Sequence, residues 1–225
     1  MRDFAHIIAI AADRKGGHEQ LEAILAETPV KSPAAIAATP DDRILALMTK
    51  RIFAAGLNWR VIEAKWPGFE TAFQGFDPAA CAFMTDERFD ELTRDASIVR
   101  NGAKIRAVAT NAAFLLDLAR EHGSAARFIA DWPDSDHVGL RDLLKKRASN
   151  LGGFTASYFL RDIGKPAFAL SPDVVKALIR EGVVAGEPSG RKDMAAIQAA
   201  FNAWSAQSGR NLTEISRILA MSVAS

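Results

Sequence analysis

The chain has 225 residues, 49% of them hydrophobic and 24% charged, with a formal net charge of +1. This length allows one large domain or two smaller units with a buried core. The single cysteine, Cys81, excludes an intrachain disulfide and a cysteine-rich zinc cluster, and the four histidines are dispersed, so we expect neither a metal nor a cofactor. No apolar run is long enough to span a membrane and no signal-peptide core is present, so we expect a cytoplasmic protein. With so small a net charge, any nucleic-acid surface must be a local patch.

Apolar residues recur at helical spacing along the chain, and no stretch shows the sustained alternation of β-branched residues that is typical of strands. The sequence therefore predicts an all-α fold of roughly a dozen short helices. The clearest apolar stripes are Ile44, Leu47, Met48 and Ile52; Ile105, Val108, Ala112, Leu115 and Ala119; Met194, Ile197, Phe201 and Trp204; and Leu212, Ile215 and Leu219.

Helix starts are marked by capping side chains. In several places the capping residue stands directly before a proline, whose fixed φ suits the first helical turn. These pairs are Ser32-Pro33, Thr39-Pro40, Asp77-Pro78 and Ser171-Pro172. Further starts are expected after Asn58, Thr85 and Asn211, and Glu214 gives the last of these the spacing of a capping box.

The helix expected after Asn58 places Trp59 and Glu63 one turn apart on one face, with Trp66 close by. An aromatic ring beside a carboxylate can stack on a flat base and also hydrogen-bond or activate water. The alternative is that both tryptophans are core residues and that Glu63 is a surface acid paired with Arg60 or Lys65.

A basic helix end followed by a glycine-rich turn and a second helix lies at about residues 140–165. The unpaired N–H groups and the dipole of the second helix favour a phosphate group. We therefore expect a helix-hairpin-helix that binds a DNA backbone. The alternative is a plain helical hairpin with a solvated basic face, which applies equally to a second basic cluster near Asn101. The candidate backbone-binding residues are Lys145, Lys146, Arg147, Asn150, Leu151, Gly152, Gly153, Thr155, Arg100 and Lys104.

Several short motifs follow one another between about residues 41 and 180. They are Ala55-Gly56-Leu57-Asn58-Trp59, Phe76-Asp77-Pro78, Ile98-Val99-Arg100 with Lys104-Ile105 and Asn111, and Leu144-Lys145-Lys146-Arg147. In this order and spacing they resemble the DNA-3-methyladenine glycosylase I family, within the helix-hairpin-helix DNA glycosylase superfamily. Residues 41–180 would then be the family-like core of a single glycosylase-like domain over residues 1–225, and residues 1–40 and 186–225 its divergent helical ends.

The resemblance implies a compact two-lobed fold with a base pocket in the cleft between the lobes. It also implies a monomeric DNA repair enzyme that flips an alkylated purine such as 3-methyladenine from double-stranded DNA and hydrolyses its N-glycosidic bond. Many superfamily members use an aspartate shortly after the hairpin, which makes Asp173 the first catalytic candidate and Glu63 the second. Asp173 could instead only complement a helix dipole. No lysine follows the hairpin at the spacing of a lyase, so we expect a monofunctional glycosylase.

The sequence also departs from the family. Arg51, preceded by Lys50, stands where the family has a pocket glutamate, and the family's pocket tyrosine stretch and zinc ligands are absent. The resemblance places Trp59 on the pocket tryptophan that stacks against the base. The base-pocket candidates are Trp59, Arg51 and the nearby Trp66. Because Arg51 would repel a cationic base, a glycosylase for a different lesion and a non-catalytic DNA-binding relative stay open as alternatives. The small net charge leaves open a third, an all-α protein with no DNA role.

Overall fold

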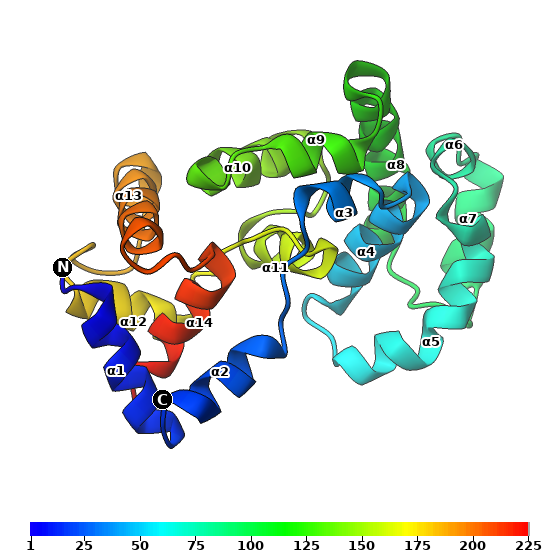
Figure 1. Ribbon diagram of the computed structural model, residues 1–225. Coiled ribbons are helices and arrows are strands. Elements are labelled where there is room, and N and C mark those ends of the chain that lie inside the picture. Colours follow the sequence, from blue (N-terminus) through cyan, green and yellow to red (C-terminus); the bar gives the residue numbers. More distant parts are fainter. Residues whose placement is uncertain (225) are drawn as a thin grey trace. The chain divides into compact units, whose positions relative to one another are not determined.

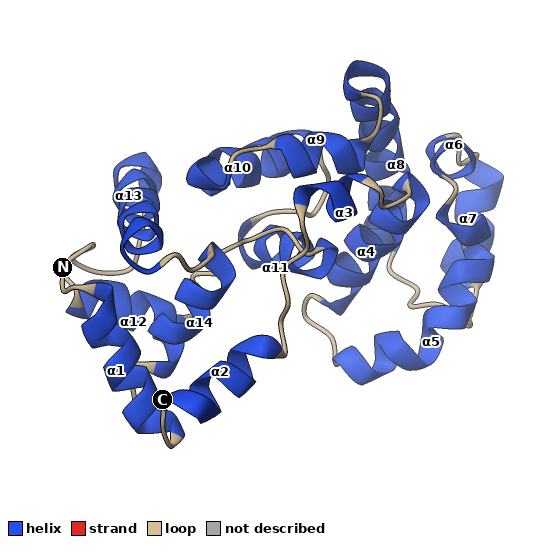
Figure 2. Ribbon diagram, in the orientation of Figure 1, coloured by secondary structure: helices blue, strands red, loops and turns tan. Residues whose placement is uncertain are grey.

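The computed structural model describes residues 1–224, and within that range it contains helices and loops but no strand (Figure 2). This confirms the all-α prediction. The described chain divides into two compact units, which are treated separately below. We find no helix in residues 1–224 with the length and apolar character that a membrane crossing requires.

Most of the expected caps begin helices. Asn211 and Glu214 form the predicted capping box. The prediction at Thr39 was wrong, because α4 begins at Asp41 with Pro40 as its N-cap, and the Thr39 hydroxyl instead donates to the Ala35 carbonyl at 3.5 Å. The other predicted caps accept a backbone N–H of the first turn through their side chains: Ser32, Asn58, Asp77, Thr85 and Ser171.

The larger unit comprises residues 31–132 and 141–165. The long helix α8 (Gly102–His122) packs against α4 (Asp41–Ala54), and it buries Ile105, Val108 and Leu115 of the predicted stripe (Figure 1). This packing fixes α4, which carries Lys50 and Arg51. The remaining helices of this unit are α3 (Pro33–Ala37), α5 (Trp59–Ala72), η1 (Gln74–Phe76), α6 (Pro78–Ala82), α7 (Asp86–Arg94), α9 (Ala125–Asp131), the second part of α10 (His137–Arg147) and α11 (Gly153–Ile163).

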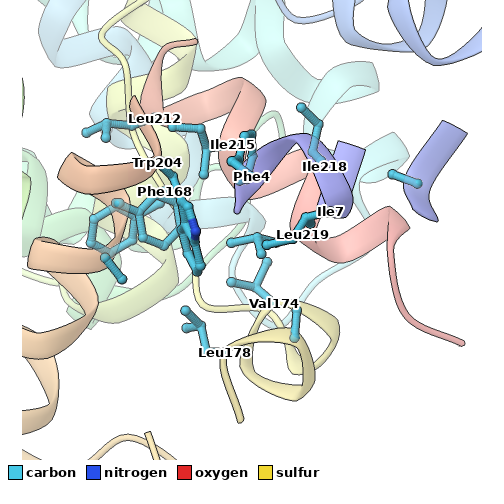
Figure 3. Packing of buried hydrophobic residues seen from close by; sticks show 14 of the residues in the cluster. Phe4, Ile7, Phe168, Val174, Leu178, Trp204, Leu212, Ile215, Ile218 and Leu219 are labelled. Atoms are coloured by element: carbon cyan, nitrogen blue, oxygen red, sulfur yellow. The ribbon is translucent and has the colours of Figure 1, made fainter. Parts of the chain in front are cut away.

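The smaller unit comprises residues 1–30, 133–140 and, within the described chain, 166–224. Its core joins the two ends of the chain, because Phe4 of α1 packs on Trp204 of α13 with ring centroids 5.7 Å apart (Figure 3). Phe168 stacks on Phe201 of α13 in the same core, with ring centroids 4.2 Å apart. Of the residues expected to be divergent ends, 1–30 and 186–224 thus share one core, whereas 31–40 belong to the larger unit. The helices of this unit are α1 (Phe4–Lys15), α2 (His18–Ala26), η2 (Asp134–Asp136), the start of α10, α12 (Pro172–Arg180), α13 (Gly190–Ser208) and α14 (Leu212–Met221).

Candidate nucleic-acid interface

The turn between α4 and α5 presents an indole ring to solvent. Gly56 adopts a φ of +76°, which is costly for residues with a Cβ, and Asn58 then accepts the Arg60 N–H at 2.9 Å. Trp59 is consequently the first residue of α5, and 38% of it is exposed. An aromatic residue this exposed has a face available for stacking.

Arg51 lies between this tryptophan and a second aromatic residue. Its guanidinium carbon is 4.7 Å from the centroid of the Trp59 ring and 5.3 Å from that of Tyr158 on α11. Asp162, one turn further along α11, accepts hydrogen bonds from Arg51 Nε and, at 2.5 Å, from Nη2. We call these four residues, Arg51, Trp59, Tyr158 and Asp162, the Arg51 site. Arg51 and Trp59 were predicted members, whereas Tyr158 and Asp162 were missed.

Lys50 forms a second cation site beside the first. Its Nζ is 2.8 Å from a Glu63 carboxylate oxygen, and it lies 5.3 Å from the Trp59 ring and 5.0 Å from the Trp66 ring. Neither Arg60 nor Lys65 was therefore the correct partner for Glu63. Trp59 and Glu63 do share one face of α5, as expected, and both contact Lys50.

Trp66 is held mainly by the aromatic core. Its ring stacks on Phe69 at 5.5 Å and on Phe76 at 5.3 Å, and its Nε1 donates to Glu70 at 3.0 Å. These contacts are those of a core aromatic residue, which was the alternative for Trp66. Trp66 is connected to Trp59 and Glu63 by Lys50, which contacts all three side chains.

The hairpin between α10 and α11 has the predicted tight turn. Asn150 and Gly153 adopt φ values of +59° and +54°, and Leu151 is buried. Asn111 of α8 holds the turn in place, because its side chain accepts the Ser149 N–H at 2.7 Å and donates to the Ser149 carbonyl at 3.1 Å. The backbone that precedes α11 is therefore pre-organised.

We expect Asn111→Ala to lower the free energy of unfolding by about 2–3 kcal/mol, because the N–H and the carbonyl of Ser149 both lose their side-chain partner. Urea unfolding followed by circular dichroism measures this change. The neighbouring Thr110→Ala is the control, since the exposed Thr110 hydroxyl donates to the Arg106 carbonyl of the same helix at 3.3 Å. Equal stability of the two variants would mean that Asn111 does not hold the turn.

The predicted basic residues have different surroundings. Lys145 and Lys146 are exposed, whereas Arg147 lies over Phe114 and within 3.9 Å of Asp117 and 3.6 Å of Glu121. The two lysines are therefore the better candidates for phosphate contacts, because the acids already offset part of the Arg147 charge.

Lys104 has a structural contact. Its Nζ donates to the carbonyls of Phe53 at 3.2 Å and Ala55 at 2.6 Å, at the end of α4, and burial lowers its pKa. A purely solvated face was therefore the wrong alternative for Lys104. Arg100 of the same cluster is exposed.

Asp173 is the second residue of α12, in the smaller unit, and its carboxylate lies 3.3 Å from Lys176 Nζ. It occupies the first turn, where a carboxylate complements the helix dipole. Among residues 1–224, no three histidine, cysteine, aspartate or glutamate side chains gather into a group that could hold a metal ion.

A family model described as methyladenine glycosylase matches residues 35–149. A DNA-3-methyladenine glycosylase from Haemophilus influenzae is 29% identical over 129 residues, which are 49% of this chain and 70% of that protein. The solved structure of 3-methyladenine DNA glycosylase I from Staphylococcus aureus is 25% identical and covers 55% of this chain and 76% of its own, with a TM-score of 0.50.

A further similarity concerns the fold alone. An 8-oxoguanine DNA glycosylase from Methanocaldococcus jannaschii is only 12% identical, yet it matches 96% of this chain and 92% of its own length, with a TM-score of 0.54. The terminal segments, which the family model leaves unmatched, therefore also have counterparts in a known helical fold.

Proposed function

This chain belongs to the methyladenine glycosylase family, and we propose that it is a monofunctional DNA repair glycosylase that removes a 3-methyladenine-like alkylated purine. The observation that carries this proposal is the exposed ring of Trp59 at the α4–α5 turn, in the same unit as the ordered hairpin. In this proposal both units form one glycosylase domain, which acts on double-stranded DNA in the cytoplasm as a monomer.

The hairpin would bind the DNA backbone. The first N–H groups of α11 have no acceptor within the helix, and the dipole adds positive potential at the same end. The positive φ of Gly153 lets the chain enter α11 without a Cβ penalty, with Thr155 in the first turn. Lys145 and Lys146 would add two phosphate contacts. These interactions place the enzyme on the duplex without reading sequence.

The base would be handled by stacking. An enzyme that acts on a base must take it out of the duplex, and the exposed face of Trp59 offers a stacking surface for it. A purine alkylated at N3 already carries positive charge and is a good leaving group, so little acid catalysis is required. The remaining task is to stabilise a sugar with oxocarbenium character while water attacks, which a carboxylate can do electrostatically.

Asp173 is our first candidate for that carboxylate and Glu63 is the second. The Asp173 ion pair with Lys176 is exposed and hence weak, so it costs little to break, whereas Glu63 is engaged by Lys50 at 2.8 Å. We expect Asp173→Asn to slow base release roughly 100-fold or more, and Glu63→Gln to have a smaller effect. Single-turnover release from alkylated duplex DNA measures both. The reverse ranking would transfer the catalytic role to Glu63.

The product distinguishes a monofunctional enzyme from a lyase. We expect an abasic site in an intact strand and no borohydride-trapped covalent complex, because the mechanism uses water and no lysine amine. Strand cleavage at the abasic site, or a trapped complex, would overturn the monofunctional assignment.

One observation favours a second candidate function. Arg51 and Lys50 place two cations beside the proposed stacking face, where a cationic base would have to bind. A relative that binds DNA without chemistry, or that acts on a different lesion, is therefore the alternative. The non-catalytic relative predicts salt-dependent binding to duplex DNA with no release of free base.

A further inference from the structure

The Arg51 site holds its arginine as it would hold a flat cationic ligand. A guanidinium is a planar, delocalised cation with coplanar N–H donors. Here it lies within cation–π distance of the Trp59 and Tyr158 rings and donates two hydrogen bonds to one carboxylate. A purine alkylated at N3 is also flat and positively charged, and an adenine-type base carries an exocyclic amino group with coplanar N–H donors. The same three side chains are therefore complementary to it.

We propose that Asp162 is the base-recognising carboxylate of this protein, and that Arg51 is an internal stand-in for the base, which the flipped cationic purine displaces. This inference rests on the proposed function. In the base-bound state the purine takes the place of the guanidinium on Trp59, and its amino group donates to Asp162. Tyr158 provides the second aromatic surface.

The helical geometry places the recognising groups together. Tyr158 and Asp162 are four residues apart on α11, so their side chains share one face, and both contact Arg51 of α4. Because one helix carries both side chains, they would stay in position when Arg51 leaves.

The charge balance explains why Arg51 controls access. Lys50 is paired with Glu63 and Arg51 with Asp162, while Arg161 adds a third guanidinium over the Tyr158 ring, 5.6 Å from its centroid. With Arg51 in place, Asp162 is neutralised and a cationic base gains little there. Once Arg51 moves away, the Asp162 carboxylate has lost its paired cation and can attract a cationic base. The side chains of Arg51 and Asp162 are 25% and 21% exposed, so water can solvate an arginine that leaves.

The test is binding of two small probes to the full chain, followed by the fluorescence of its tryptophans or by NMR titration. The probes are 3,9-dimethyladeninium, a cation blocked at N9 as in a nucleotide, and 9-methyladenine, its neutral counterpart. We expect Arg51→Ala to raise affinity for the cation about tenfold by removing the competitor, and Asp162→Asn to lower it. The double variant should bind the cation as weakly as Asp162→Asn, and the neutral probe should respond little.

A merely structural ion pair predicts a different pattern. Loss of either partner would then lower binding of both probes alike, and that result would overturn the proposal, as would an unchanged cation affinity in Arg51→Ala. Arg43→Ala is the matched control, because Arg43 makes another bidentate pair from α4, with Glu70 at 2.8 and 3.1 Å, and does not lie over Trp59. We expect it to bind both probes as the wild type does.

Probe binding separates this inference from the proposed function, because it needs no bond cleavage. The opposite signs of Arg51→Ala and Asp162→Asn, found without any base release from DNA, would support the recognition site and overturn the enzymatic assignment. Base release from DNA by a protein whose two variants change in the same direction would do the reverse. Urea unfolding of each variant establishes that the binding data come from folded protein.

Discussion

Trp59→Ala is expected to slow the release of an alkylated purine from duplex DNA by about 5- to 150-fold. Stacking of one base on an aromatic side chain contributes about 1–3 kcal/mol, and the loss falls on the state in which the base is outside the helix. Trp59 also contacts the cations of Lys50 and Arg51, so its removal takes away the surface on which both are held. Single-turnover kinetics on a duplex with one 3-methyladenine measures the effect.

The control for Trp59→Ala is Phe83→Ala. Phe83 is the most exposed of the large hydrophobic residues, at 81%, and it lies in the same unit, so this variant removes an aromatic ring of no proposed function. We expect wild-type release from it, and duplex affinity close to that of wild type for both variants. Undiminished release after Trp59→Ala would remove Trp59 from the base site.

Reversal of Lys145 and Lys146 to glutamate is the second large change. We expect affinity for duplex DNA to fall on the order of 100-fold at low salt, because two phosphate contacts are lost and two repulsive charges are introduced. The slope of log K against log salt concentration should become shallower by about 2. Fluorescence anisotropy of a labelled duplex over a series of salt concentrations measures both quantities.

A matched double reversal tests whether position or only net charge matters. Arg94 and Arg127 are exposed cations of the same unit, and each forms a local ion pair within its own helix, with Asp90 on α7 and with Asp131 on α9. Arg94→Glu with Arg127→Glu changes the net charge by the same amount. We expect it to retain most of the affinity. Equal losses in the two double variants would show that the hairpin is not the contact surface.

Local chemistry explains why part of this structure could be predicted. A capping side chain acts on N–H groups two or three residues away, so Asn58 and Asp77 mark their helices within a single short window. The stripe of α8 needs only the helical period. The failure at Thr39 is also local, because the hydroxyl bonds back to Ala35 instead of capping the next helix.

The Arg51 site could not be assembled in the same way. Arg51 and Asp162 are 111 positions apart, and only the packing of α4 with α11 brings them together. The four-residue spacing of Tyr158 and Asp162 does predict that they share one face of a helix, but it does not predict that this face contacts Arg51. Likewise, the Phe4 N–H donates to the Gln207 side chain, 203 positions further along the chain. The sequence of either chain end by itself therefore could not predict that the two ends share a core.

The most direct experiment on the enzymatic activity is release of free base by the wild-type full chain from a duplex that contains a single 3-methyladenine, with the base identified by mass spectrometry. We expect free 3-methyladenine to appear together with an equal amount of abasic sites in intact strands. Salt-sensitive binding to that duplex without any free base would contradict the proposed activity, and would identify the protein as a DNA-binding member of the family that does not cleave this base.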